Sequence, residues 1–298
     1  MGVRGRDAVT LGASGLSIDS HTILYGVIGD PVRHSRSPLM LNRAFQEKDI
    51  NGIYAAFHVT AEGLGDFVRG VRAMGVGGVN VTIPHKLGVM EWLDEIDPAA
   101  RAIGAVNTIV NRGGRLVGYN TDGIGYVRSL KEEAEPELSG KRIVVIGAGG
   151  AARGIVYALI GEGPASIAIV NRTADRAHSL ADDFREKFPA LQADSYDALP
   201  GLCSEADIVI NTTSVGMYPN TEQSPVDAAW LKSGAVASDL IYNPMKTLFL
   251  TEAEARGCRI HGGLGMFIYQ GAYAFEYWTG EDAPVAAMRE TVLTSLQS

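Results

Sequence analysis

Residues 141–154, KRIVVIGAGGAARG, combine an apolar strand, a glycine-rich turn and the first turn of a helix. Gly147 permits the tight turn, Gly149 lets the backbone approach a pyrophosphate, and Ala152 is small enough for the helix to pack on the strand. The phosphates of a dinucleotide would then lie at the helix N-terminus, where backbone amides point outward. This stretch predicts a dinucleotide-binding strand–turn–helix unit in the middle of the chain.

Composition limits the classes of protein that the chain can represent. Its 298 residues are enough for two domains of ordinary size, and 46% apolar with 20% charged residues is typical of a globular protein. A net charge of -8 argues against a nucleic-acid surface, and no apolar run is long enough for a membrane span or a signal peptide. Two distant cysteines and six histidines without ligand spacing argue against a metal site. We therefore expect a cytoplasmic protein. The sequence does not decide between a monomer and a homodimer.

Strand-like and helix-like runs alternate on both sides of the glycine loop. The first series begins at residues 23–29, ILYGVIG, and includes Ser37 and Pro38 as an expected helix N-cap and N1 pair. Residues 105–120 predict a β-hairpin, and the polar residues 131–141 predict a linker.

The second series, from residue 142 to residue 261, is typical of a doubly wound Rossmann domain. Two helix-like stretches follow this apparently complete domain, so we expect them to return and pack on the first domain. The prediction is an α/β protein of two domains: an N-terminal extension over 1–22, a substrate domain from 23–121 with 262–298, and a nucleotide-binding domain over 122–261.

The end of the strand that follows the glycine loop, SIAIV at residues 166–170, indicates which dinucleotide binds. NAD-selective domains usually place a carboxylate there, about 20 residues beyond the glycine loop, to bind the ribose 2′-hydroxyl. Here the strand SIAIV is followed by NRTADR, which supplies Asn171, Arg172, Thr173 and Arg176. Guanidinium groups bind a 2′-phosphate through charged hydrogen bonds. The cofactor prediction is therefore NADP.

A nicotinamide enzyme that reduces a carbonyl needs a proton donor for the developing alkoxide. The first domain offers Lys86, directly after a strand in NVTIPHK, and Asp122, in YNTDG at the domain junction. A carboxylate near a lysine can position it for proton transfer. Short polar groups at further strand ends indicate a ligand site, because ligands of open α/β sheets bind at the carboxyl ends of strands; these groups are Ser35, Ser37, Thr82, Asn107 and Asn120.

Seven motifs follow one another along the chain: HSRSP (34–38), NVTIPHK (80–86), GAVNT (104–108), NTDG (120–123), GAGGAAR (147–153), NRT (171–173) and GGLGM (262–266). In sequence and order, from about residue 23 to the C-terminus, they resemble the shikimate dehydrogenase family. The resemblance implies NADP-dependent reduction of 3-dehydroshikimate to shikimate, a step of aromatic amino-acid biosynthesis.

The resemblance also implies roles for individual residues. Lys86 and Asp122 match the catalytic pair. Residues that match the family's substrate contacts are Ser35, Ser37, Thr82, Lys86, Asn107, Asp122, Tyr242 and Gln270. Residues that match its NADP contacts are Gly147, Ala148, Gly149, Gly150, Ala151, Asn171, Arg172, Thr173, Arg176, Leu240, Gly263 and Met266.

One position departs from the family pattern: Gly262 stands where a more polar residue often precedes GLGM. His85, next to Lys86, we interpret as structural, because its side chain should point away from that of its neighbour. Two alternatives stay open. One is a dual quinate/shikimate dehydrogenase, often NAD-dependent, and the other is a non-catalytic sensor of shikimate-pathway ligands on the same fold.

Overall fold

The computed structural model describes residues 9–11 and 16–297, and the chain divides into two compact units. The first unit contains the described chain up to Asn120 and everything from Gly271 onward. The second unit runs from Thr121 to Gln270. The return to the first unit thus falls inside helix α9 (Leu264–Thr279), nine residues later than the boundary at residue 262 expected from the sequence.

Part of the predicted N-terminal extension has regular structure. Strand β1 (Val9–Leu11) pairs antiparallel with β2 (Leu16–Ile18), with Val9 opposite Ile18. Residues 1–8 and 12–15, which complete this part of the extension, lie outside the described residues.

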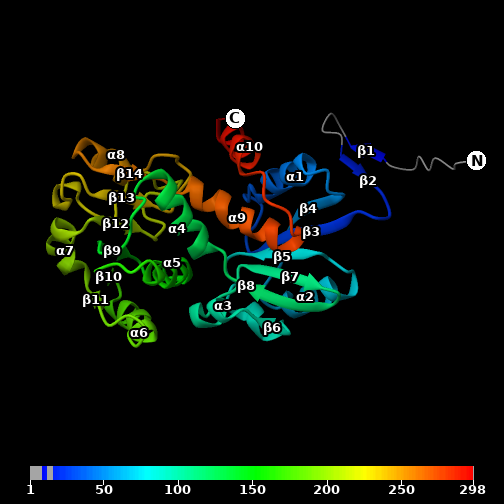
Figure 1. The fold of residues 1–298 in the computed structure, drawn as a ribbon, viewed down its shortest axis with the longest axis horizontal. Coiled ribbons are helices and arrows are strands. Elements are labelled where there is room, and N and C mark those ends of the chain that lie inside the picture. The colour runs from blue at the N-terminus through cyan, green and yellow to red at the C-terminus, as the bar shows by residue number, and fades with distance from the viewer. Residues whose placement is uncertain (1–8, 12–15, 298) are drawn as a thin grey trace, which may run out of the picture. The chain divides into compact units, whose positions relative to one another are not determined.

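The larger sheet of the first unit has the strand order β4–β3–β5–β7–β8–β6 (Figure 1). β4, β3 and β5 are parallel to one another, whereas β7 pairs antiparallel with both β5 and β8. The predicted hairpin is therefore present as β7 and β8. The strand bounds are β3 Ile23–Gly29, β4 Gly52–His58, β5 Gly78–Val81, β6 Glu95–Ile96, β7 Thr108–Arg112 and β8 Arg115–Tyr119.

Alternation along β3 sends side chains to both faces of this sheet. Tyr25 stacks on Phe45 of α1, with 4.8 Å between the ring centroids, and Phe45 in turn lies 5.4 Å from Phe275 of α9. On the other face Ile28 packs in one apolar cluster with Val68 of α2. The C-terminal helices therefore complete this domain, as predicted. The helix bounds are α1 Ser37–Glu47, α2 Leu64–Ala73, α3 Pro98–Ile103, α10 Val285–Gln297 and the 3-10 turn η2 Gly88–Trp92.

The second unit contains a fully parallel sheet in the order β11–β10–β9–β12–β13–β14, the arrangement of a Rossmann domain. The edge strand β11 was not predicted. Of its four residues only Leu191 is buried, so the stretch lacks the apolar pattern on which the prediction rested. The strands are β9 Arg142–Ile146, β10 Ser166–Val170, β11 Leu191–Asp194, β12 Ile208–Asn211, β13 Val236–Asp239 and β14 Arg259–His261.

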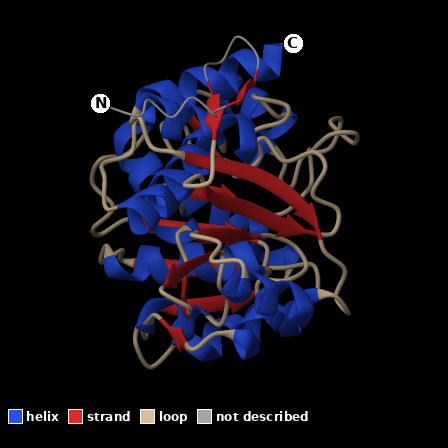
Figure 2. Cartoon of the chain, turned by 90° about the vertical axis from the view of Figure 1, so that its right-hand side faces the viewer, coloured by secondary structure: helices blue, strands red, loops and turns tan. Residues whose placement is uncertain are grey.

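Helices cover both faces of this parallel sheet. Figure 2 colours the whole chain by element type, with helices in blue and strands in red. One apolar core joins the sheet to α4, α5 and α6, and another joins it to α7 and α8. No helix in the described part of the chain is long and apolar enough to cross a membrane. The helices are α4 Asp122–Glu133, α5 Gly150–Gly161, α6 Ala174–Phe184, α7 Leu199–Glu205 and α8 Leu248–Ala255, with 3-10 turns η3 Tyr196–Ala198 and η4 Ala228–Trp230.

The polar stretch 131–141 is not a linker, and that prediction was wrong. Leu138 is fully buried in the core of the second unit, and the nearly buried Glu135 pairs with Arg259 at 2.6 Å and with Lys141 at 3.2 Å. The charge of Glu135, which suggested a solvated linker, is instead buried and neutralised by these two basic side chains.

Glycines let α4 lie unusually close to its neighbours. A Cβ atom on Gly123 would stand 2.1 Å from the carbonyl oxygen of Gly154 in α5, and one on Gly125 would stand 2.7 Å from the amide nitrogen of Gln270 in α9. Backbone atoms cannot move aside as a flexible side chain can. The two glycines therefore fix the position of α4, the helix that begins with Asp122.

A buried polar network closes the carboxyl ends of β12 and β13. Asn211 donates its amide to Asp239 at 3.1 Å, and Asp239 also accepts from the Ile241 amide at 3.0 Å and the Thr247 hydroxyl at 2.8 Å. Burial raises the pKa of Asp239 to about 6, although these hydrogen bonds act in the opposite direction.

The α4 packing leads to a stability prediction. Gly123→Ala should lower the free energy of unfolding by about 1–3 kcal/mol, because the new methyl group meets backbone rather than a movable side chain. Gly201→Ala in α7 is the matched control, since a Cβ there meets nothing within 4 Å. The control should be neutral or slightly stabilising in urea denaturation. Equal stability of the two variants would contradict the packing argument.

Asp239 leads to a prediction of pH dependence. Between its ordinary pKa of 3.8 and about 6 the unfolded carboxyl is ionised while the folded one keeps its proton. Asp239 therefore lowers the free energy of unfolding as the pH rises through this window, by up to about 3 kcal/mol. Asp239→Asn should gain stability relative to the parent from pH 4 to pH 7 in urea titrations.

Asp207→Asn is the control for that measurement. The hydrogen bond from the Arg142 amide, together with Lys232, holds the pKa of Asp207 below its usual value. Its variant should therefore lose stability relative to the parent as the pH rises. A constant difference between Asp239→Asn and the parent across the range would rule out the raised pKa.

Candidate functional site

The glycine turn of the second unit has the backbone geometry that a dinucleotide requires. Gly147 has a φ of 111°, and its amide donates to the Val170 carbonyl at 2.8 Å. Gly149 is the N-cap of α5, and a Cβ atom on Gly149 or Gly150 would meet no atom within 4 Å. The amides of this helix N-terminus are thus accessible to an anion. Ala152 is fully buried, as close packing of the helix requires.

The predicted 2′-phosphate residues follow β10, the neighbour of β9. Thr173 is the N-cap of α6 without a side-chain capping hydrogen bond, and Asn171 donates to its carbonyl at 2.9 Å. Arg172 and Arg176 are exposed and pair with no carboxylate of the described chain. Asp175 lies in the first turn of α6 and not at the strand end, where a ribose-binding carboxylate stands. This charge pattern fits a phosphorylated ribose.

A further group of predicted residues follows β13 and β14. The Gly263 amide donates to the Ile241 carbonyl at 3.1 Å, and a Cβ atom on Gly263 would stand 1.9 Å from the Leu240 carbonyl oxygen. Only glycine allows this approach. Met266, in the first turn of α9, is partly buried against the same core as Leu240. The structure therefore brings Leu240 against Gly263 and into the same core as Met266, although Leu240 precedes both by more than 20 positions in the chain.

Tyr242 and Gln270 are linked through Phe267 of α9. The Tyr242 ring stacks on that of Phe267 with 4.8 Å between centroids, and the Gln270 amide donates to the Phe267 carbonyl at 2.8 Å. Thr121 donates its hydroxyl to the Gln270 carbonyl at 3.0 Å. Asp122 follows as the first residue of α4, with 6% of its surface exposed. A helix N-terminus stabilises a carboxylate at that position.

In the first unit, the two predicted serines lie at and just before the start of α1. Ser37 was expected as the N-cap, but it is the first helical residue and Arg36 is the N-cap. The Ser37 amide donates to the Ser35 hydroxyl oxygen at 3.3 Å, so Ser35 satisfies one of the amides left open at the helix start. Both serines follow the carboxyl end of β3 in the chain.

Lys86 lies in a tightly held turn after β5. Thr82 donates its amide to the Ile28 carbonyl at 2.9 Å and accepts from the His85 amide at 2.9 Å, while the Lys86 carbonyl accepts from Val106 at 2.9 Å. The His85 ring is buried and lies 2.6 Å from the Val59 carbonyl oxygen. The structural role predicted for this histidine is confirmed, and the turn backbone on both sides of Lys86 is fixed.

Asn107 is nearly buried, at 3% exposure, and its neighbours form a polar chain that sequence reasoning missed. The Thr108 hydroxyl donates to Asn107 Oδ1 at 3.0 Å, Asn80 donates to Thr108 at 3.1 Å, and Tyr54 donates to Asn80 at 2.7 Å. Burial raises the pKa of Tyr54 well above its usual value. Asn80 and Thr108 belong to the motifs NVTIPHK and GAVNT, so those motifs could have identified the two residues as part of the site.

Asn120, the remaining polar group predicted at a strand end, is also buried, and it donates to the Ala105 carbonyl at 3.0 Å. Among the described residues, no three His, Cys, Asp or Glu side chains gather as a metal site would need. Cys203 and Cys258 are both buried and unpaired with each other, and burial raises the pKa of Cys203 to about 12. These thiols are poor nucleophiles.

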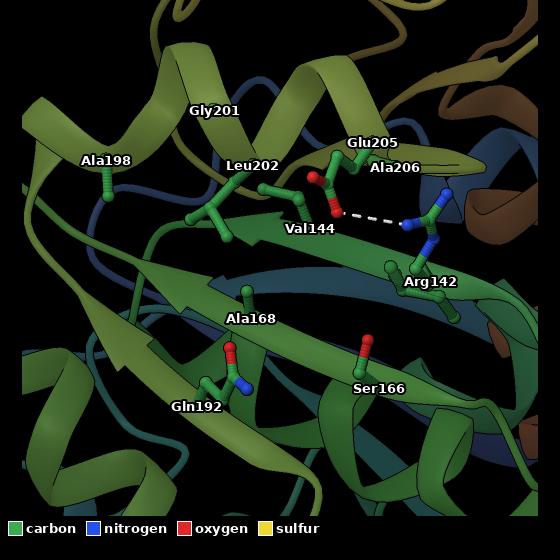
Figure 3. A pocket seen from close by; sticks show the side chains of 11 residues that line it. Arg142, Val144, Ser166, Ala168, Gln192, Ala198, Gly201, Leu202, Glu205 and Ala206 are labelled. Carbon is green, nitrogen blue, oxygen red and sulfur yellow. Dashed lines mark hydrogen bonds and ion pairs between the residues drawn. The ribbon is translucent and has the colours of Figure 1, made fainter.

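A cavity of about 430 Å³ lies between α7 and the first halves of β9 and β10 (Figure 3). Arg142 and Ser166, the first residues of β9 and β10, line it together with Leu202 and Glu205 of α7. Arg142 is held by Glu205 at 3.0 Å. Because ligands of open α/β sheets bind at the carboxyl ends of the strands, this cavity is not the nucleotide site.

Known protein families match most of the chain. Residues 27–109 match the shikimate dehydrogenase substrate-binding domain, residues 129–229 match shikimate/quinate 5-dehydrogenase, and residues 263–293 match the shikimate 5′-dehydrogenase C-terminal domain. The NADP(+)-dependent shikimate dehydrogenase of a Geobacillus strain is 53% identical over 92% of this chain and 99% of its own length.

Solved structures of shikimate and quinate dehydrogenases are similar to this chain in both fold and sequence. A shikimate dehydrogenase in complex with NADP+ has a TM-score of 0.89 at 42% identity, over 94% of this chain and 98% of that one. The Listeria monocytogenes enzyme, in complex with shikimate and NAD, has a TM-score of 0.86 at 40% identity, over 92% and 98%. A quinate dehydrogenase from Corynebacterium glutamicum, in complex with NAD, reaches the same TM-score of 0.86 at 31% identity, over 92% and 99%. Because the chain is about half identical to such an enzyme over nearly its whole length, it belongs to the shikimate dehydrogenase family.

Proposed function

We propose that this chain is an NADP-dependent shikimate dehydrogenase that reduces 3-dehydroshikimate to shikimate in the biosynthesis of aromatic amino acids. One observation carries the proposal. The second unit has both a glycine turn with unobstructed space around Gly149 and Gly150 and two exposed arginines, Arg172 and Arg176, and this combination suits NADP. The family membership supplies the substrate class. We place the enzyme in the cytoplasm, where Cys203 and Cys258 remain thiols.

The residues present fit NADP chemically. The first turn of α5 offers amide donors beside glycines without side chains, which suits the pyrophosphate. Arg172 and Arg176, with Asn171 and Thr173, would hold the 2′-phosphate, because guanidinium groups form paired, charged hydrogen bonds with phosphate oxygens. Leu240, Gly263 and Met266 would contact the nicotinamide. When bound, NADPH supplies the hydride that the reduction needs.

The chain's own residues would supply the proton and the binding groups. We propose that Lys86 donates a proton to the oxygen of the substrate carbonyl as that oxygen gains negative charge, so a ketone becomes a secondary alcohol. Its ammonium group also stabilises the developing charge. Asp122 would be the second member of the catalytic pair and would accept hydrogen bonds.

The substrate is a small acid with several hydroxyl groups, so it needs many short hydrogen-bonding partners. We propose Ser35, Ser37, Thr82, Asn107, Tyr242 and Gln270 for this task, together with Lys86 and Asp122. In the first unit the backbones that carry these groups are fixed by the hydrogen bonds after β3 and β5. Such preorganisation lowers the entropy lost on binding.

The alternative that a specific observation keeps open is quinate oxidation, since a quinate dehydrogenase shares the fold closely. Initial rates at the nicotinamide absorbance band, with shikimate or quinate and with NADP or NAD, separate the possibilities. We expect the fastest rate with shikimate and NADP. A faster rate with quinate would overturn the substrate assignment, and no turnover with any pair would favour the ligand-sensor alternative.

Lys86→Ala should lower kcat by about two orders of magnitude or more, with little change in KM for shikimate, because it removes the proposed proton donor. Lys48→Ala, at an exposed lysine after α1, is the matched control and should keep parental kinetics. Steady-state assays of purified protein measure both. Near-parental turnover by Lys86→Ala would exclude this lysine from the proton transfer.

Arg172→Ala should raise KM for NADP by about tenfold or more and leave KM for NAD nearly unchanged, because only NADP carries the 2′-phosphate. Arg185→Ala removes an exposed arginine that pairs with Asp182 at the end of α6, and it should alter neither constant. Equal changes in both constants for Arg172→Ala would rule out phosphate recognition by this residue.

A further inference from the structure

The buried polar groups between β12 and β13 lie beside two proposed ligand contacts of the second unit. Asn211 is the last residue of β12 and Asp239 the last of β13, and the two are opposite residues in the parallel register. Both residues are fully buried. Directly after Asp239 come Leu240 and Tyr242, the proposed contacts of the nicotinamide and of the substrate.

The backbone determines which way the Asn211 amide is turned. Its oxygen accepts the Thr213 amide at 3.0 Å, and a backbone amide can only donate. Its nitrogen lies 3.2 Å from the Val215 carbonyl oxygen, which can only accept. The same nitrogen donates to Asp239 at 3.1 Å. The Asp239 oxygen at this contact must therefore be an acceptor.

That Asp239 oxygen also holds the chain that follows β13. It accepts the Ile241 amide at 3.0 Å, while the second carboxyl oxygen accepts the Thr247 hydroxyl at 2.8 Å. The Ile241 carbonyl in turn accepts the Gly263 amide at 3.1 Å. The backbone of residues 240–242 is therefore fixed on its amide side by Asp239 and on its carbonyl side by Gly263.

On the other side of Asn211 lies the glycine turn. The Thr212 amide and hydroxyl donate to the Ile146 carbonyl at 2.9 and 2.7 Å, directly before that turn. A Cβ atom on Gly147 would stand 2.4 Å from the Thr212 hydroxyl oxygen. The Asn211 carbonyl also accepts the Leu240 amide at 3.1 Å. Asn211 thus connects the turn proposed for the pyrophosphate with the segment proposed for the nicotinamide.

We propose that Asp239, together with Asn211, is a positioning residue that fixes residues 240–242 relative to the glycine turn, and so sets the spacing between the nicotinamide and pyrophosphate parts of the cofactor site. Asp239 acts through the Ile241 backbone, because its carboxyl group is buried and both oxygens accept hydrogen bonds from the chain. A cofactor held at two correctly spaced points binds more tightly than either half alone. The inference rests on the proposed function, because it takes Leu240 and Tyr242 as ligand contacts.

The orientation of Asn211 decides which substitutions keep this arrangement. Asp239→Asn can place its oxygen where Asn211 and Ile241 donate, and its nitrogen then faces the Thr247 hydroxyl, which can accept. Asp239→Leu has a similar size but offers no acceptor, so the Ile241 amide loses its partner. The first variant therefore preserves the geometry, and the second removes it.

The test compares the whole cofactor with one half of it. Calorimetry would measure the affinity for NADP and for adenosine 2′,5′-bisphosphate, which carries the 2′-phosphate but no nicotinamide. Asp239→Leu should bind NADP about 5- to 30-fold more weakly, the size of one or two hydrogen bonds, and should bind the bisphosphate as the parent does. Asp239→Asn should recover most of the NADP affinity. At saturating NADP, kcat of Asp239→Leu should fall about tenfold or more, because Tyr242 is displaced.

Asp207→Leu is the matched control. Asp207 also accepts a backbone amide, that of Arg142 at 2.9 Å, but it lies at the amino end of β12. This variant should lose stability and keep both affinities. If Asp239→Leu does not fold, Asn211→Leu removes the same contact from the other side and should show the same difference between the two ligands.

Equal weakening of NADP and the bisphosphate, or parental affinity for both in the Leu variants, would overturn the inference. An Asp239→Asn variant as weak as Asp239→Leu would also overturn it, since the geometry alone would not then be responsible. Failure of the parent to bind either ligand would instead refute the NADP site of the proposed function, and this inference with it.

Discussion

Parallel pairing of strands is the constraint on which the second unit's chemistry depends. Ile146 lies beside Val170 in the register, and Asn211 lies beside Asp239, so these strands end at one edge of the sheet. The loops that follow are therefore neighbours, although their residues are separated by up to about a hundred positions in the chain. A shift of register in one strand would move its loop away from the others.

Close backbone approach is the second recurring feature of this unit. A side chain on Gly147 would meet the Thr212 hydroxyl at 2.4 Å, one on Gly263 would meet the Leu240 carbonyl, and one on Gly123 would meet the Gly154 carbonyl. In each case glycine lets two chain segments come within a distance that any other residue would forbid. At Gly123 the close approach serves helix packing, whereas at Gly147 it lets the turn before α5 lie against the residues that follow β12.

Motifs predicted the fold well where local sequence determines the structure. The glycine turn, the strand before it and the residues NRTADR are contiguous, so their geometry could be read from spacing. The edge strand β11 was missed because only one of its four residues is buried, so no apolar pattern marks it. The segment 131–141 was misjudged because its burial depends on distant partners such as Arg259. The hydrogen bond between Asn80 and Thr108 depends on cross-strand register, which no local pattern reports.

The two units achieve rigidity by different physical means. In the first, the groups proposed to hold substrate are side chains, and a side chain needs neighbours that fix its rotation. The uncharged side chains of Tyr54, Asn80 and Thr108 form a chain of hydrogen bonds that reaches Asn107. In the second, the proposed donors to the pyrophosphate are backbone amides at the start of α5, which the helix itself holds in place. A neutral network avoids the cost of burying an ion, which Asp239 does bear, as its raised pKa indicates. Side-chain recognition therefore tolerates few substitutions among its supporting residues, whereas backbone recognition tolerates any change that preserves the turn and its glycines.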